Sequence, residues 1–253
     1  MPRTILILGG TAEANALAAA LAENPGLRVI VSLAGRTAMP RRPAGEIRSG
    51  GFGGADGLAA YLTATAVDQV IDATHPFAAR MGWNAAIACT QAAVPLLRLE
   101  RPAWVGQAGD YWTEIDDWSE AAALLTAGSR RVLLALGRQE LAPFAHLDAL
   151  WFLIRSVDAP DPLPAFGRSQ TLQTRGPFTL ADECRLLAEY DIDTIVCKNS
   201  GGDAAVAKLT AARQMGLKVV MRKRPSRPPT PTATTLAEAI AWLDQPLSPT
   251  GLP

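Results

Sequence analysis

Residues 4–22 read TILILGGTAEANALAAALA, and this stretch determines the predicted fold. The apolar run 4–8 suits a β-strand that is buried on both faces, and the alanine-rich run 12–22 suits a helix. Gly9, Gly10 and Thr11 form the turn between them. Such a turn directs backbone N–H groups and the helix dipole toward one point, which favours an anion such as a phosphate. The strict G-x-G-x-x-G dinucleotide motif is absent, so a plain βα turn is the alternative interpretation.

The same alternation continues along the whole chain. Further strands are expected at residues 28–33, 47–54 (a short strand that runs into a glycine loop), 69–74, 95–100, 131–137, 151–157, 194–202 and 217–223. Further helices are expected at 57–66, 77–91, 138–147, 179–190, 204–215 and 236–244. Repeated β–α alternation predicts parallel sheets flanked by helices. We therefore predict an α/β protein with two Rossmann-like domains, residues 1–128 and 129–253.

The composition excludes several classes of protein. The 24 basic and 24 acidic side chains balance, so the net charge indicates neither nucleic acid nor a membrane surface as a partner. Three cysteines far apart predict reduced thiols and a cytoplasmic location. With two histidines and no cluster of other ligands, no metal site is expected. The apolar N-terminus imitates a signal peptide, but the glycine turn and Glu13 interrupt it.

The end of the second expected strand indicates which cofactor could bind. The segment VSLAGRT (31–37) carries Ser32 and Arg36 and no carboxylate. In NAD-specific Rossmann domains an acidic residue holds the ribose 2′-OH, whereas an arginine accommodates the 2′-phosphate of NADP. A surface arginine in a loop would be the simpler interpretation of Arg36 alone. Together with the glycine turn, the two residues favour NADPH.

The segment IDATHPFAARM (71–81) follows the strand expected at 69–74. Ligands of open α/β sheets bind outside the carboxyl ends of the strands, so Thr74 and His75 should face the ligand. Pro76 has no N–H, which costs nothing in the first turn of a helix. His75 could be a catalytic group, or it could only cap the helix or support its neighbours. Arg80 lies on the polar face of the same expected helix.

Basic residues follow two strands of the second half. CKNSGGDAA (197–205) ends a strand with Lys198, Ser200 and Gly201, which form a second anion-ready turn. MRKRPSRPP (221–229) adds Arg222 and Lys223 at another strand end. A basic run is usually a solvated face. In a chain of zero net charge, its place at a core strand indicates a small ligand with several negative charges.

Three of these motifs together resemble the precorrin-6A reductase family of cobalamin (vitamin B12) biosynthesis. They are ILILGGTAEA, IDATHPFAARM, and VCKNSGG with the downstream KRP, and they are spread over nearly the whole chain. The resemblance implies NADPH-dependent reduction of a double bond of the precorrin-6A macrocycle to give precorrin-6B. It also implies an N-terminal domain that binds NADPH, a C-terminal domain that contributes to the substrate cleft, and an active site between them. The cobalt-free substrate fits better than the cobalt-bearing one, although no residue decides between them.

The resemblance and the motifs together assign roles to individual residues. The expected NADPH contacts are Gly9, Gly10, Thr11, Ser32 and Arg36, with Thr74, His75, Pro76, Phe77 and Ala78 on the nicotinamide side. The expected contacts to the carboxylates of the anionic tetrapyrrole are Arg80, Lys198, Ser200, Gly201, Arg222 and Lys223. His75 is the candidate proton donor; alternatively it binds cofactor while water supplies the proton.

Two other functions stay open at this point. The first is another NADPH-dependent reductase of the same architecture, and the second is a non-catalytic NADPH sensor. Channelling of the product to neighbouring pathway enzymes is a further expectation.

Overall fold

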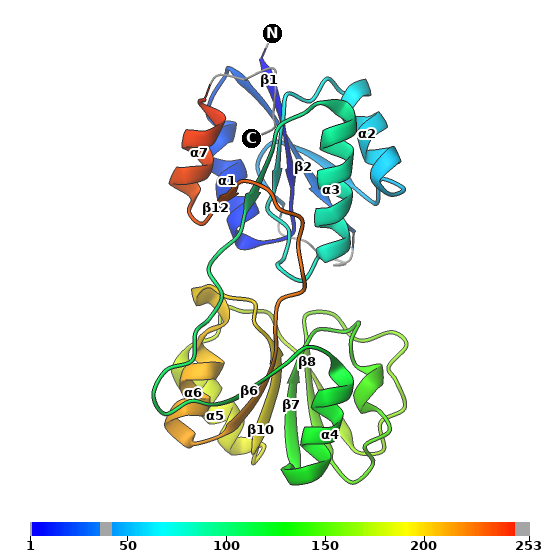
Figure 1. The fold of residues 1–253 in the computed structure, drawn as a ribbon. Coiled ribbons are helices and arrows are strands. Elements are labelled where there is room, and N and C mark those ends of the chain that lie inside the picture. Colours follow the sequence, from blue (N-terminus) through cyan, green and yellow to red (C-terminus); the bar gives the residue numbers. More distant parts are fainter. Residues whose placement is uncertain (1, 36–41, 246–253) are drawn as a thin grey trace. The chain divides into compact units, whose positions relative to one another are not determined.

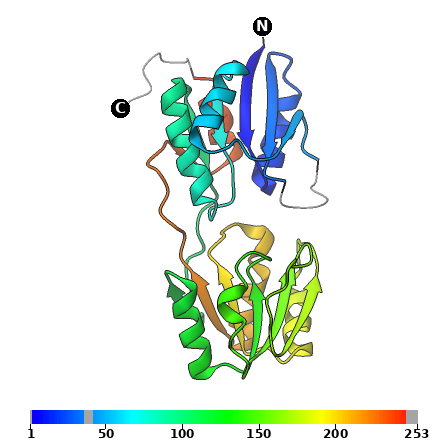
Figure 2. The ribbon, with the colours of Figure 1, turned by 90° about the vertical axis from the view of Figure 1, so that its right-hand side faces the viewer.

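The computed structural model describes residues 2–35 and 42–245. The chain forms two compact units (Figure 1). Unit 1 contains Met1–Pro102 and Pro225–Pro253, and unit 2 contains Ala103–Arg224. Each unit has one six-stranded sheet with helices on both faces (Figure 2), which confirms the predicted α/β fold with two Rossmann-like domains.

The sheet of unit 1 has the strand order of a doubly wound fold. Its strands are β1 (Arg3–Leu8), β2 (Leu27–Leu33), β3 (Glu46–Ser49), β4 (Gln69–Asp72), β5 (Leu96–Leu99) and β12 (Thr232–Ala233). They follow the order β12-β5-β4-β1-β2-β3, and these neighbours pair in parallel. The chain moves from β1 toward β3 and then returns to place β4 on the other side of β1. The carboxyl ends of β1 and β4 therefore form the topological switch point, where ligands of such sheets bind.

In the residues that the structure describes, four helices cover the sheet of unit 1. On one face, α1 (Ala12–Ala22) and α7 (Leu236–Leu243) pack with one apolar core. On the other face, α2 (Ala55–Ala64) and α3 (Ala79–Ala92) pack with a second core. Residues 4–8 of the central strand β1 are buried between them, because Ile5 and Ile7 contribute to one core and Leu6 and Leu8 to the other. This two-sided burial explains its continuous apolar sequence.

The sheet of unit 2 repeats this arrangement with one difference. One of its edge strands comes before the other five strands in the chain, whereas β12 comes after the other five strands of unit 1. Its strands are β6 (Tyr111–Ile115), β7 (Arg131–Ala135), β8 (Trp151–Ser156), β9 (Ser169–Gln173), β10 (Thr194–Lys198) and β11 (Lys218–Arg222). They follow the order β6-β11-β10-β7-β8-β9, again in parallel. The switch point lies between β7 and β10, so residues after these strands share one edge.

One face of this sheet packs with α4 (Trp118–Gly128) and the 3₁₀ turn η1 (Ala142–Phe144). The other packs with α5 (Leu180–Glu189) and α6 (Ala207–Met215), and a second 3₁₀ turn, η2 (Asp203–Ala205), precedes α6.

The observed division differs from the boundary predicted between residues 128 and 129. β6 and α4 precede that boundary but belong to unit 2, because β6 pairs with β11. β12 and α7 lie at the other end of the chain but belong to unit 1, because β12 pairs with β5. The chain therefore passes from one unit to the other twice. This pairing between distant segments leaves no local mark in the sequence.

Some expected elements also differ in detail. The helix expected at 138–147 is wrong, since this segment holds only η1. Leu141, Phe144 and Leu147 contact the core at a spacing of three residues, which suits a 3₁₀ turn as well as an α-helix. Three of the four edge strands, β6, β9 and β12, were not predicted. They are short and partly exposed, so they lack a continuous apolar run.

A buried ion pair joins β8 to α5 in unit 2. Arg155 Nη1 lies 2.8 Å from Glu183 Oε1, and the two side chains are 8% and 2% exposed. The Arg155 guanidinium also lies 4.4 Å from the centre of the Phe178 ring. Removing one member of such a pair leaves an uncompensated charge in the core, which is far more costly than losing an exposed pair.

We therefore expect Arg155→Met to lower the free energy of unfolding by about 3–5 kcal/mol. The matched control is Arg28→Met, which breaks the exposed Arg28–Glu46 pair and should cost less than about 1 kcal/mol. Urea denaturation followed by far-UV circular dichroism measures both. Equal losses for the two variants would contradict a structural role for the buried pair.

Candidate functional site

The turn after β1 presents exposed backbone at the switch point of unit 1. Gly9 N–H donates to Ser32 O at 2.9 Å, and a Cβ on Gly9 would lie 3.0 Å from Val31 Cγ1. Gly10 has a φ of +110°, and no atom of the described residues lies within 4 Å of where its Cβ would be. Gly9 thus allows close packing against β2, and Gly10 leaves space for a ligand to approach the main chain.

Thr11 connects the two turns that meet at this switch point. Its Oγ1 accepts a hydrogen bond from Ala14 N at 3.1 Å, which caps α1, and donates to Ala73 O at 2.8 Å. Glu13, in the first turn of α1, pairs with Arg101 at 2.8 Å. The helix dipole favours an anion at this N-terminus, but the Glu13 carboxylate would repel one. The Arg101 guanidinium offsets the negative charge of Glu13. The turns after β1 and β4 are thus held together beside a helix end suited to phosphate.

A cation that was not among the predicted site residues lies beside the end of β2. Arg48, on the neighbouring strand β3, donates from Nη1 to Ser32 Oγ at 3.4 Å. It also donates to the carbonyls of Gly50 at 2.6 Å and Gly51 at 2.7 Å, and its guanidinium lies 3.6 Å from the Phe52 ring centre. Arg36 lies outside the described residues. Arg48 lies beside Ser32 only because β3 pairs with β2. In the sequence, the one feature that could have indicated Arg48 is its place just before the glycine loop.

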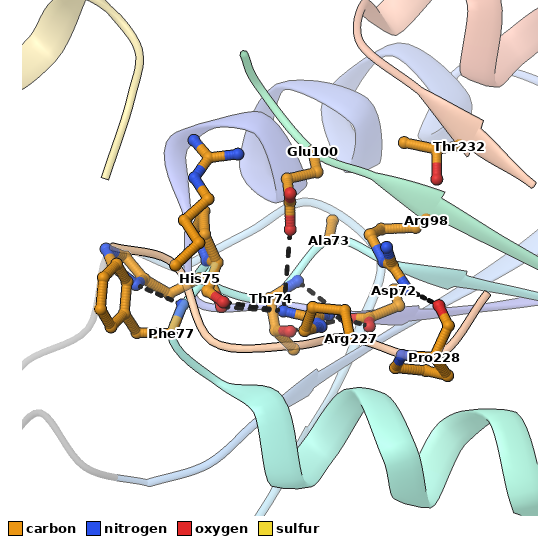
Figure 3. Close-up of polar contacts among 12 residues, drawn as sticks. Asp72, Ala73, Thr74, His75, Phe77, Arg98, Glu100, Arg227, Pro228 and Thr232 are labelled. Carbon is orange, nitrogen blue, oxygen red and sulfur yellow. Dashed lines mark hydrogen bonds and ion pairs between the residues drawn. The ribbon is translucent and has the colours of Figure 1, made fainter. Parts of the chain in front are cut away.

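The turn after β4 holds His75 in a defined orientation (Figure 3). Asp72 Oδ1 accepts from Thr74 N at 3.1 Å and from Thr74 Oγ1 at 2.6 Å. Phe77 N donates to His75 Nδ1 at 3.2 Å, and Ala78 N donates to His75 O at 2.7 Å. Because Nδ1 accepts a hydrogen bond, the neutral imidazole carries its proton on Nε2. His75 can therefore act as a hydrogen-bond donor through Nε2.

Helix α3 begins at Ala79, so Pro76, Phe77 and Ala78 belong to the turn that precedes it. Arg80 lies exposed in the first turn of α3. Further along the helix, burial raises the pKa of the Cys89 thiol to about 12, with a smaller contribution from the Asp72 carboxylate. The thiol stays protonated at neutral pH, and so Cys89 is no nucleophile.

Two of the expected substrate-binding cations of unit 2 converge on one carboxylate. Lys198 ends β10 and Arg222 ends β11, and both form ion pairs with Glu140 in the loop after β7. The Arg222 Nη1–Glu140 Oε1 distance is 3.3 Å. Lys223 instead pairs with the exposed Asp116 at 2.8 Å, and this hydrogen bond raises the pKa of the Lys223 amine. Two partly buried cations facing one carboxylate have the chemistry needed to bind a carboxylate ligand.

The remainder of the KNSGG turn is occupied by structural contacts. The Asn199 side chain accepts from Trp104 N at 2.8 Å and donates to Trp104 O at 2.9 Å. Arg224 donates to the carbonyls of Asn199 at 3.0 Å and Ser200 at 3.2 Å. Gly201 is buried and has a φ of +68°, which few other residues adopt. The turn is therefore a rigid support for Lys198.

The family model described as "Precorrin-6x reductase CbiJ/CobK" matches residues 4–244. The chain belongs to this family. A precorrin-6A reductase from Rhodococcus erythropolis is 52% identical over 94% of this chain and 96% of its own length. A cobalt-precorrin-6A reductase from Priestia megaterium is 28% identical over 87% of this chain and 90% of its own. The solved structure "CobK precorrin-6A reductase" has a TM-score of 0.89 at 42% identity, and covers 95% of this chain and 96% of that one.

Membership of the precorrin-6x reductase family agrees with the resemblance that the three motifs indicated, and identifies the protein as an oxidoreductase. In the part of the chain that the structure describes, no helix has the length and apolar character needed to cross a bilayer. Within the same residues, no three His, Cys, Asp or Glu side chains form a group that could hold a metal ion.

If Glu140 occupies the place of a ligand carboxylate, removing its charge should strengthen anion binding. We expect Glu140→Gln to bind citrate, a small polycarboxylate, about fivefold more tightly, as loss of a competing ion pair worth ~1 kcal/mol predicts. Fluorescence can report binding, because the Arg222 guanidinium lies 5.0 Å from the Trp118 ring centre. Asp116→Asn, which removes the exposed partner of Lys223, is the control and should change little. Unchanged or weaker citrate binding by Glu140→Gln would show that the carboxylate only supports the two cations.

Proposed function

We propose that the protein is a precorrin-6A reductase, which uses NADPH to reduce one double bond of the precorrin-6A macrocycle and form precorrin-6B in cobalamin biosynthesis. The observation that carries the proposal is the hydrogen bond from Thr11 to Ala73, which joins the glycine turn to the His75 turn at a Rossmann-like switch point. Membership of the precorrin-6x reductase family and the relative that is 52% identical support the same reaction. The lower identity of the cobalt-precorrin-6A reductase, 28%, favours the cobalt-free substrate.

The residues of unit 1 fit NADPH. The open main chain at Gly10 and the N-terminus of α1 suit the pyrophosphate, and Gly9 and Thr11 shape this turn. Arg48, hydrogen-bonded to Ser32, places a positive charge at the end of β2, where the 2′-phosphate of NADP binds in Rossmann domains. Arg36 is proposed as a second cation there. When bound, NADPH supplies the hydride, and the task of the protein is to orient the reacting atoms.

The turn Thr74–Ala78 is proposed to line the nicotinamide side of the site. We propose His75 as the catalytic residue, acting through the N–H on Nε2. Donation of a proton would require a doubly protonated ring, and protonation of Nδ1 would break its hydrogen bond with Phe77 N. The geometry thus favours a hydrogen bond that orients cofactor or substrate, while water supplies the proton.

The substrate contacts are proposed for unit 2. Precorrins carry several acetate and propionate carboxylates, which suit clustered cations in a protein without net charge. Lys198 and Arg222, which now share Glu140, are the main candidates. Lys223, Ser200, Gly201 and, from unit 1, Arg80 are further candidates. The free thiols of Cys89, Cys184 and Cys197 support a reducing, cytoplasmic compartment, in which neighbouring pathway enzymes could receive the product by channelling.

The function is tested by following the absorbance of NADPH with purified protein and precorrin-6A. We expect NADPH to be oxidised only when precorrin-6A is present, with precorrin-6B as the product and NADH as a poorer donor. Binding of NADPH without oxidation would support the sensor instead. Oxidation with small enoates but not with precorrin-6A would support a reductase of another substrate class.

The role of His75 is tested by two substitutions. His75→Gln keeps an N–H donor near the position of Nε2, and so we expect it to retain turnover within about fivefold of the original. His75→Leu removes the donor and should lower turnover about 10- to 100-fold, as loss of a hydrogen bond to a charged or polarised group predicts. Steady-state kinetics over a range of pH distinguishes the roles, because a proton donor would be lost equally in both variants.

A further inference from the structure

Arg227 lies on the segment Pro225–Pro231, which leads from β11 of unit 2 back to β12 of unit 1. In the sequence it belongs to the basic run 221–229, which begins at the end of β11. In the structure its side chain is only 6% exposed, and it points toward the turn after β4 (Figure 3). Arg227 is therefore not available as a surface cation, and its charge must serve another purpose.

The guanidinium of Arg227 binds both ends of the turn that carries His75. Its Nη2 lies 2.5 Å from Asp72 Oδ2, and its Nη1 donates to His75 O at 3.3 Å and to Pro76 O at 3.2 Å. Nη1 also lies 3.8 Å from Glu100 Oε2, at the end of β5. The other oxygen of Asp72 holds Thr74. One planar group thus fixes the carboxylate before the turn and two carbonyls within it.

Because the charges of Asp72 and Arg227 are both buried, each depends on the other. The Asp72 side chain is 3% exposed, and a carboxylate so far from water needs a positive partner. The segment that carries Arg227 is itself anchored, since Arg98 on β5 donates to the carbonyl of Pro228. A lysine could supply the charge but not the forked contacts to three acceptors.

Gly82 on α3 makes room for this guanidinium. A Cβ at Gly82 would lie 2.6 Å from Arg227 Nε and 2.8 Å from Nη2. Glycine within a helix costs about 1 kcal/mol relative to alanine. The helix thus carries a residue that is locally unfavourable, and the space it leaves is filled by Arg227.

We propose that Arg227 is a positioning residue, which holds the turn 72–76 and thereby orients the imidazole of His75. Its effect on catalysis rests on the proposed function, whereas its effect on the imidazole does not. The route is short: Arg227 fixes the His75 and Pro76 carbonyls, and the following Phe77 N–H determines the position of His75 Nδ1.

The chain has two histidines, His75 and His146, so an NMR spectrum of ¹⁵N-labelled imidazoles has one reporter and one internal reference. Gly82→Ala places a methyl group against the guanidinium without altering the turn or any charge. We expect Gly82→Ala and Arg227→Lys to shift the His75 nitrogen signals and leave those of His146 unchanged. With NADPH and precorrin-6A, kcat should fall about 10- to 100-fold, the loss that a small misplacement of a positioned group predicts. KM should change little.

The double variant Gly82→Ala/Arg227→Ala provides the sharpest comparison. Once the guanidinium is absent, the added methyl has nothing to displace. The kcat of the double variant should therefore be no lower than that of Arg227→Ala alone, and its His75 signals should be shifted no further. Arg185→Ala, which removes an arginine that is 71% exposed, is the control and should behave as the original protein. If Arg227→Ala fails to fold, Gly82→Ala and Arg227→Lys decide the question.

Unchanged His75 signals in folded Gly82→Ala and Arg227→Lys would overturn the proposal. A fall in kcat in the double variant equal to the combined falls of the two single variants would also overturn it, because the two residues would then act independently. If the signals shift but the original protein does not oxidise NADPH with precorrin-6A, the proposed function fails and the positioning role stands.

Discussion

Parallel pairing is the constraint on which the rest of this structure depends. In each unit the six strands run in one direction, so all their carboxyl ends lie at one edge of the sheet. The chain then returns past the first strand, to β4 in unit 1 and to β10 in unit 2. The turns after the two neighbouring strands therefore lead to opposite faces of the sheet, which leaves an opening between them. The hydrogen bond from Thr11 to Ala73 spans the first of these openings. Residues more than 60 positions apart in the sequence become neighbours there.

The charged groups at these edges fall into two kinds that burial distinguishes. Asp72 and Arg227 are 3% and 6% exposed, so their charges can only compensate each other and hold the main chain. Lys198 and Arg222 are 18% and 26% exposed, and Glu140 is their shared partner. A ligand carboxylate can compete for cations that water also reaches, but not for a guanidinium enclosed by a helix and two strand ends. Net charge alone could not separate the two kinds.

Much of the fold could be predicted from local sequence patterns. The helix expected at residues 12–22 is α1, because the strand–glycine–helix pattern is local. The helix expected at 138–147 was wrong, because apolar residues three apart fit a 3₁₀ turn equally well. The domain boundary differs for another reason. Edge strands β6 and β12 join sheets whose other strands lie elsewhere in the chain, and their short, partly exposed sequences do not reveal it.

The sequence by itself determined the α/β class, the two glycine turns after strands, the position of His75 after a buried strand and the resemblance to the precorrin-6A reductase family. These features depend on residues that are adjacent or regularly spaced along the chain. Only the tertiary structure decided what the arginines do. Arg48 reaches Ser32 because β3 pairs with β2, and Arg227 reaches the His75 turn because the chain returns to unit 1. Whether a cation binds a ligand or a carbonyl depends on burial and on neighbours from distant segments, which only the folded chain brings together.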